Sequence, residues 1–117
     1  MTEEMFKQRT KKLALNVIGF VEKLPKSRTA DVLGRQLLRS GTSVGANYRA
    51  ACRGKSTADI IAKLSIVEEE ADETLYWMEL LVESGMVLQA NAQSIMSEAN
   101  EILAMTVASI KTLRKRQ

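Results

Sequence analysis

The sequence has no histidine, one cysteine and one proline, and only 4% of its residues are aromatic. Without histidine, the chain lacks the Ser-His and Cys-His pairs of nucleophilic catalysis and the Glu-x-x-His ligands of a di-iron bundle. Cys52 is most simply a small core residue, and no disulfide within the chain is possible, so the expected compartment is a reducing cytoplasm. We therefore expect no enzymatic activity, no catalytic residue, no metal and no cofactor.

Long apolar runs are also missing from the chain. No segment approaches the ~18 apolar residues that a membrane-spanning helix needs. The N-terminal sequence MTEEMFKQRTKK has no apolar stretch behind a basic start. We therefore expect neither a signal peptide nor an association with a membrane.

The residues that are abundant are helix formers, chiefly Leu, Ala, Glu, Lys and Arg. Apolar positions recur every three to four residues, which predicts helices at about residues 3–24, 29–53, 57–84 and 91–114. A length of 117 residues fits one domain with a single core. Because the connections are short, we predict an all-α fold, an antiparallel up-down-up-down four-helix bundle over residues 1–117.

Local signals mark several helix ends. Thr2 is a plausible N-cap, Ser56 with Asp59 resembles a capping box, Pro25 ends the first helix, and Gly85 is a natural residue to follow the third. The third helix carries an apolar stripe that we expect in the core: Ile60, Leu64, Val67, Ala71, Leu75, Met78 and Val82.

Two glycines, Gly41 and Gly45, lie four residues apart within the second predicted helix. Each costs about 1 kcal/mol relative to alanine in a helix. Their presence in adjacent turns indicates either a break or the close approach of another backbone. Because the apolar period continues across them, we favour a continuous helix.

The charges divide along the chain. Residues 26–55 carry seven basic groups and one acidic group, whereas residues 56–84 carry one basic and eight acidic groups. Five arginines of the second helix fall within about 80° of one another, roughly opposite its apolar face, along ~38 Å of helix. They are Arg28, Arg35, Arg39, Arg49 and Arg53. Guanidinium groups in such a row could bind the phosphates of a nucleic acid.

The acidic groups of the third helix offer these arginines another partner. They are Glu68, Glu69, Glu70, Asp72, Glu73, Glu79 and Glu83. So many carboxylates repel one another unless they are paired or solvated. If they pair with the arginines, within the subunit or between subunits, the chain would be a structural or protein-interaction module instead. A solvated arginine face is the plainest alternative.

The carboxylates also allow a distant enzymatic alternative. Glu69, Glu70 and Glu73 form an E-E-x-x-E pattern, and Glu98 with Glu101 forms E-x-x-E. Two such pairs could hold Mg²⁺, as in the all-α nucleotide pyrophosphohydrolases of the MazG type, which use a similar scheme. The second pair in that scheme usually ends in aspartate, where this chain has Glu101.

Two further groups are candidates for subunit contacts. Tyr76 and Trp77 lie off the apolar stripe of the third helix, and these residue types are enriched at interfaces. Ser43 and Asn47 lie at the edge of the arginine row, where mid-helix hydroxyl and amide groups lower helix propensity. Interhelical hydrogen bonds or contacts with a partner would account for them.

The stretch from Gln36 to Gly85 resembles a bacterial family called four helix bundle proteins, or 23S rRNA intervening-sequence proteins. Its most specific features here are R-S-x-x-S-x-x-x-N, from Arg39 to Asn47, and E-A-D-E-T-x-Y-W, from Glu70 to Trp77. The motif positions are Arg39, Ser43, Asn47, Glu70, Asp72, Glu73, Tyr76 and Trp77. The chain departs from many relatives at Ala50 and Ala51, where they carry an acidic residue, and at Ile60, where they carry an aromatic.

The resemblance implies an antiparallel four-helix bundle that assembles as a homopentamer, with these motif positions in structural roles or at subunit contacts. It also implies a link to RNA, because some members are encoded within insertions in ribosomal RNA genes. A related group, the accessory proteins of diversity-generating retroelements, looks similar and works with nucleic acid. We therefore expect a non-enzymatic homo-oligomer that binds nucleic acid, RNA in preference to DNA, and possible protein partners. The five arginines are the candidate binding residues.

Overall fold

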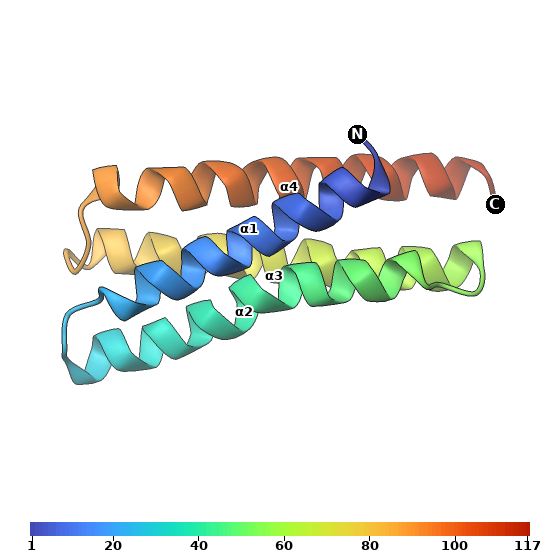
Figure 1. Cartoon of the computed structure of the whole chain (residues 1–117). Coiled ribbons are helices and arrows are strands. Elements are labelled where there is room, and N and C mark those ends of the chain that lie inside the picture. Colours follow the sequence, from blue (N-terminus) through green and yellow to red (C-terminus); the bar gives the residue numbers. More distant parts are fainter.

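The computed structural model describes residues 1–117 as four α-helices joined by short turns. They are α1 (Glu3–Glu22), α2 (Arg28–Cys52), α3 (Thr57–Glu83) and α4 (Gln89–Lys115). Successive helices run antiparallel and form a rod with extents of 48 × 20 × 20 Å (Figure 1). The predicted all-α bundle is confirmed, and every predicted helix end lies within two residues of the observed one. None of the helices combines the length and apolar character needed to cross a membrane.

The helix ends are fixed by local hydrogen bonds. The Oγ1 atom of Thr2 accepts a hydrogen bond from the backbone N–H of Met5 at 3.1 Å, and Ser56 Oγ accepts one from Asp59 N at 3.1 Å. Both predicted N-caps are therefore confirmed. After α3, Gly85 adopts a φ of +83°, a left-handed conformation that favours glycine and ends the helix.

Gly41 and Gly45 lie where α1 packs closely against α2, which is continuous through both. A Cβ atom on Gly41 would lie 2.9 Å from each Cγ atom of Val17. A Cβ atom on Gly45 would lie 3.1 Å from Thr10 Oγ1 and 3.4 Å from the Thr10 carbonyl carbon. The two glycines therefore allow the backbone of α1 to approach α2, as one of the two sequence interpretations predicted.

We expect Gly41→Ala to lower the free energy of unfolding by about 1 kcal/mol. Alanine gains up to ~1 kcal/mol of helix propensity, but overpacking a stiff valine costs ~1–3 kcal/mol. Gly19→Ala in α1 is the matched control, because a Cβ atom there meets nothing within 4 Å, and it should stabilise by ~0.5–1 kcal/mol. Urea unfolding measures both, and equal stabilisation by the two changes would contradict the close contact.

The buried line of α3 differs in part from the predicted stripe. Leu64, Val67, Ala71 and Met78 are buried as expected, whereas Ile61, Thr74 and Leu81 are buried where Ile60, Leu75 and Val82 were predicted. For Thr74 the reason is that its hydroxyl donates to the Glu70 carbonyl at 2.8 Å and lies 3.1 Å from Ser40 Oγ of α2. A hydroxyl with its hydrogen bonds satisfied can be buried, which apolar periodicity does not detect.

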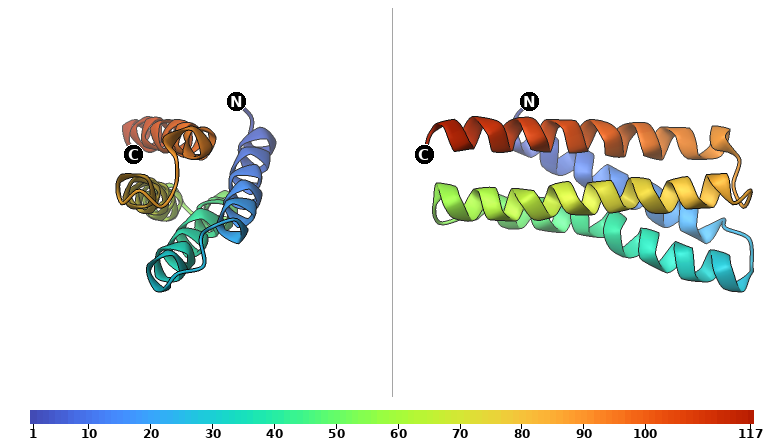
Figure 2. Two further views of the ribbon diagram at one scale, coloured as in Figure 1. Left: turned by 90° about the vertical axis from the view of Figure 1, so that its left-hand side faces the viewer. Right: turned by 180° about the vertical axis from the view of Figure 1, so that it is seen from behind.

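The bundle is unevenly closed around α1. This helix packs along α2 but crosses the rod obliquely and approaches α4 mainly near its own N-terminal half (Figures 1 and 2). Between the other half of α1 and the start of α4 lies an open groove of about 710 Å³. Its lining includes the exposed side chains of Leu15 and Leu88. The first helix is therefore attached chiefly through α2.

Candidate nucleic-acid interface

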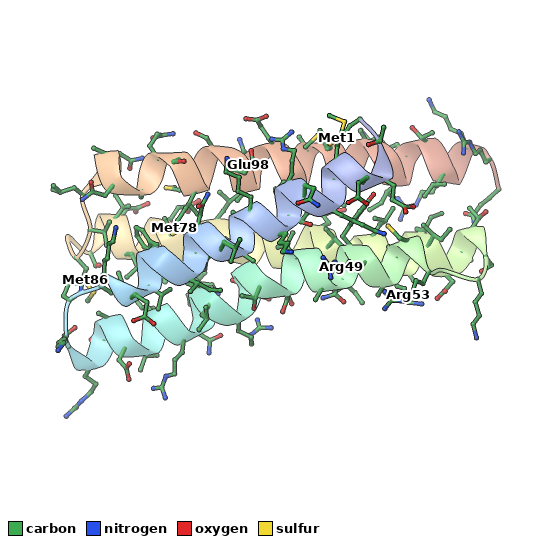
Figure 3. All side chains as sticks on the ribbon, viewed as in Figure 1. Met1, Arg49, Arg53, Met78, Met86 and Glu98 are labelled. Atoms are coloured by element: carbon green, nitrogen blue, oxygen red, sulfur yellow. The ribbon has the colours of Figure 1, made fainter.

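All five arginines of α2 are exposed, on the side of the helix opposite its buried residues. The buried side includes Leu37 and Val44, both fully inaccessible. Figure 3 shows Arg49 and Arg53 on the half of α2 that lies beside the N-terminal half of α1. The arrangement that the sequence predicted for this face, a row of guanidinium groups along the bundle surface, is present.

The five arginines of this row differ in their charged neighbours, because different helices lie beside them. Arg39 turns toward α3, where its Nη2 atom lies 2.8 Å from Glu73 Oε1 and its Nη1 atom 3.4 Å from Glu70 Oε1. Arg35 lies 3.6 Å from Asp31 one turn earlier, but both side chains are more than 70% exposed, so this pair is weak. The proposed pairing of arginines with the acids of α3 therefore holds for Arg39 within the subunit.

The other three arginines, Arg28, Arg49 and Arg53, form no salt bridge within the chain. Arg49 instead lies next to Lys7 and Lys11 of α1, with which it lines a shallow hollow between α1 and α2. A group of cations with little acidic compensation attracts anions and raises their local concentration. The binding potential of the face is therefore greatest away from α3.

Ser43 and Asn47 satisfy their side chains within α2. Ser43 Oγ donates to the carbonyl of Arg39 at 2.6 Å, and Asn47 Nδ2 donates to the carbonyl of Ser43 at 2.8 Å. Both residues are half-buried beside α3. These hydrogen bonds satisfy the Ser43 hydroxyl and the Asn47 amide N–H group within α2. They leave the Asn47 amide oxygen available as an acceptor.

Two buried polar atoms on α3 have no hydrogen-bond partner. They are Glu70 Oε2 and Trp77 Nε1. Next to Trp77, the Tyr76 ring packs edge-on at a centroid distance of 5.1 Å and is 52% exposed. The exposed Tyr76 ring and the half-buried Trp77 together present the residue types that are enriched at interfaces. Asp72, the remaining motif acid, is exposed to solvent.

The carboxylates of the pyrophosphohydrolase alternative do not converge. Glu98 and Glu101 of α4 both bind Arg9 of α1, with Nε–Oε2 and Nη2–Oε1 distances of 2.9 and 3.1 Å respectively. Glu70 and Glu73 bind Arg39 instead, and no three acidic or cysteine residues gather in a geometry that could hold a metal ion. Arginine thus binds Glu70 with Glu73 and Glu98 with Glu101, whereas Glu69 forms no salt bridge.

The Arg9–Glu98 pair joins α1 to α4 where the two helices approach, and Figure 3 shows Glu98 at that place. The hydrogen bond from Arg9 lowers the pKa of Glu98 below its usual value, against the opposing effect of burial. Sequence reasoning missed Arg9, because nothing local to residue 9 indicates a partner 89 residues away. It also missed Lys7 and Lys11, since the helical wheel of α2 does not show which residues of α1 lie beside it.

We expect Glu98→Gln to lower the free energy of unfolding by about 1 kcal/mol at pH 7. The change removes a charge-assisted hydrogen bond, and the partial exposure of that bond reduces its contribution. A carboxylate whose pKa is lowered by folding stabilises the folded state at pH values above its unfolded pKa of ~4.3. It loses that contribution as the pH falls through its pKa in the folded state. The difference from the wild type should therefore narrow below about pH 4. Urea unfolding at a series of pH values tests this prediction, with the exposed Glu79→Gln as the control. A difference in unfolding free energy between Glu98→Gln and the wild type that stays constant with pH would contradict it.

Comparison with known proteins gives the following matches. The sequence profile of the 23S rRNA-intervening sequence proteins matches residues 3–108. A crystal structure from Bacteroides thetaiotaomicron, described as a protein of unknown function from the S23 ribosomal protein family, superposes with a TM-score of 0.87. It is 35% identical, and the alignment covers 95% of this chain and 99% of that one. No protein with a curated function matches the chain.

Proposed function

Because the chain belongs to the family of 23S rRNA-intervening sequence proteins, we propose that it acts by binding nucleic acid, RNA in preference to DNA, on the basic face of α2. One observation carries this proposal: five arginines share an exposed face, and Arg28, Arg49 and Arg53 have no acidic partner within the chain. Arginine binds phosphate oxygens in a bidentate manner and is always charged. Contacts of this kind supply most of the affinity of non-specific binding.

The proposed interface would recognise shape and charge rather than base sequence. Stacking of unpaired bases requires exposed aromatic rings, and the exposed aromatic of the bundle, Tyr76, lies on α3 rather than on the basic face. Arg39 contributes less than its position on the helical wheel indicates, because Glu70 and Glu73 already neutralise it. We expect weak discrimination between sequences and strong dependence on salt.

The proposal includes self-association through the outer face of α3, as the family resemblance implies for a homopentamer. It is supported by the exposed apolar side chains of Tyr76 and Ile66 on α3. Symmetric assembly would repeat one weak phosphate-binding face in each subunit, which raises avidity without new contacts.

A second candidate function, a structural or protein-interaction module, is favoured by the pairing of Arg39 with the acids of α3. The two candidates differ in what the remaining arginines do. In the second, they would bind carboxylates of a partner protein and would not need phosphate.

Fluorescence anisotropy with a labelled structured RNA, a single-stranded RNA and a duplex DNA tests the proposal between 50 and ~200 mM salt. We expect binding at low salt that weakens steeply as salt rises, because each phosphate contact adds about 0.7–0.9 to the slope of log K against log salt. Absence of binding to all three probes at low salt would overturn the nucleic-acid proposal and favour the protein-interaction module.

A further inference from the structure

The close contact between α1 and α2 creates a hollow of about 260 Å³ whose rim is cationic. Its charged lining residues are Lys7 and Lys11, one turn apart on α1, and Arg49 of α2. Its small lining residues are Ala14, Gly45 and Ala46, and no acidic residue lines it. Three cations therefore surround a depression into which an anion could settle.

The geometry of the hollow follows from the glycines of α2. Because Gly45 has no side chain, Thr10 of α1 comes so close to α2 that a Cβ atom on residue 45 would lie 3.1–3.4 Å from it. That approach places the cations of two helices around one depression, and the lack of larger side chains at Gly45 and Ala46 keeps it open. Gly45 thus serves both helix packing and access to the surface between the helices.

The three cations have little internal competition. Lys11 and Arg49 form no salt bridge, and Lys7 has only Glu3, at 3.4 Å, whose side chain is 61% exposed. An exposed pair of this kind contributes little and is displaced easily. The hydroxyls of Thr10 and Thr42 donate to carbonyls of their own helices, so the cations are the donors that an anion would meet.

We propose that this α1/α2 hollow is a phosphate-binding site, formed jointly by Lys7, Lys11 and Arg49, at which a phosphodiester group of the nucleic-acid backbone is held. This inference rests on the proposed function and specifies it: the strand crosses from α1 onto α2 at Arg49 instead of following α2 alone. The same chemistry would also accept a free phosphate or pyrophosphate, so the test separates backbone phosphate from free anion.

The test compares two double variants with the same change of charge. Lys7→Gln/Lys11→Gln removes two of the three charges of the hollow, whereas Lys12→Gln/Lys23→Gln removes two exposed charges outside it, one on α1 and one directly after its end. Lys12 is the next residue after Lys11 but lies on the α4 side of the helix, where its charge acts on Glu98. Circular dichroism confirms that both variants fold.

By anisotropy at ~100 mM salt, the hollow variant should bind single-stranded RNA at least about 10-fold more weakly, with a salt slope lower by about 1, and the control should change less than about 3-fold. Equal losses of RNA affinity in the two variants would overturn the phosphate site in the hollow while leaving the proposed function intact. If the wild type binds no RNA or DNA, the proposed function fails. A pyrophosphate titration followed by amide NMR shifts then tests separately whether the hollow binds an anion. Amide shifts confined to the residues that line the hollow on α1 and α2, including Lys11, Gly45 and Arg49, would support a free-anion site, and unchanged spectra would overturn it.

Discussion

Reversal of the three unpaired arginines of α2, as Arg28→Glu/Arg49→Glu/Arg53→Glu, is expected to weaken RNA binding by at least about 100-fold at 0.1 M salt. Each arginine is exposed and has no acidic partner in the chain, so its full charge is available to phosphate. Loss of three phosphate contacts should lower the salt slope by about 2 for single-stranded RNA. Anisotropy over a salt series measures both quantities.

A matched control separates position from net charge. Lys23→Glu/Lys111→Glu/Lys115→Glu changes the net charge by the same amount at exposed sites outside α2. Long-range attraction alone would make the two triple variants equally weak, and that result would contradict an interface on α2. Retention of most of the affinity by the control, with the thermal unfolding of both unchanged, would locate the interface on this helix.

Trp77→Ala is expected to weaken self-association at least about 30-fold, equivalent to the ~2 kcal/mol of an interface hot spot. The side chain is half-buried, its Nε1 atom has no acceptor within the chain, and the exposed Tyr76 ring packs against it. A neighbouring subunit that packs on the Tyr76 ring and on the accessible part of Trp77 would be anchored by this aromatic pair. Sedimentation velocity over a series of protein concentrations measures the change.

Two further variants make this result specific. Leu88→Ala truncates another large exposed apolar side chain, 72% accessible, in the α3–α4 connection beside the groove that α1 lines, and should leave assembly unchanged. Trp77→Phe keeps an aromatic ring and most of the packing against the core, and it removes only an N–H group that is buried without a partner, so it should retain most of the self-association. If Trp77→Ala is folded and assembles as the wild type does, Trp77 lies outside the interface.

The features that the sequence predicted correctly are those that depend on neighbours along the chain. The cap at Thr2 and the helix end at Gly85 require only residues within one turn, and the apolar period continues through Gly41 and Gly45. The burial of Thr74 was missed because it depends on Ser40 of another helix. Burial of a polar group is a property of the pair, so no pattern within one helix shows it.

The basic face shows the same limit. A helical wheel places Arg39 and Arg49 in one row, yet one binds the acids of α3 and the other lies beside the lysines of α1. The sequence predicted which residues share the face. It did not determine the neighbours of each, since these depend on how the bundle positions α1 and α3 around α2.

The one-sided attachment of α1 has a consequence for dynamics. A helix that packs along α2 and touches α4 near Arg9 has fewer contacts than α3, which packs along both α2 and α4, so the separate opening of α1 costs less than that of α3. Its amide protons should exchange before those of α3, and most readily in the half that borders the open groove. A strand held across α1 and α2 would suppress that opening, which would couple occupancy of the surface to the local stability of the first helix.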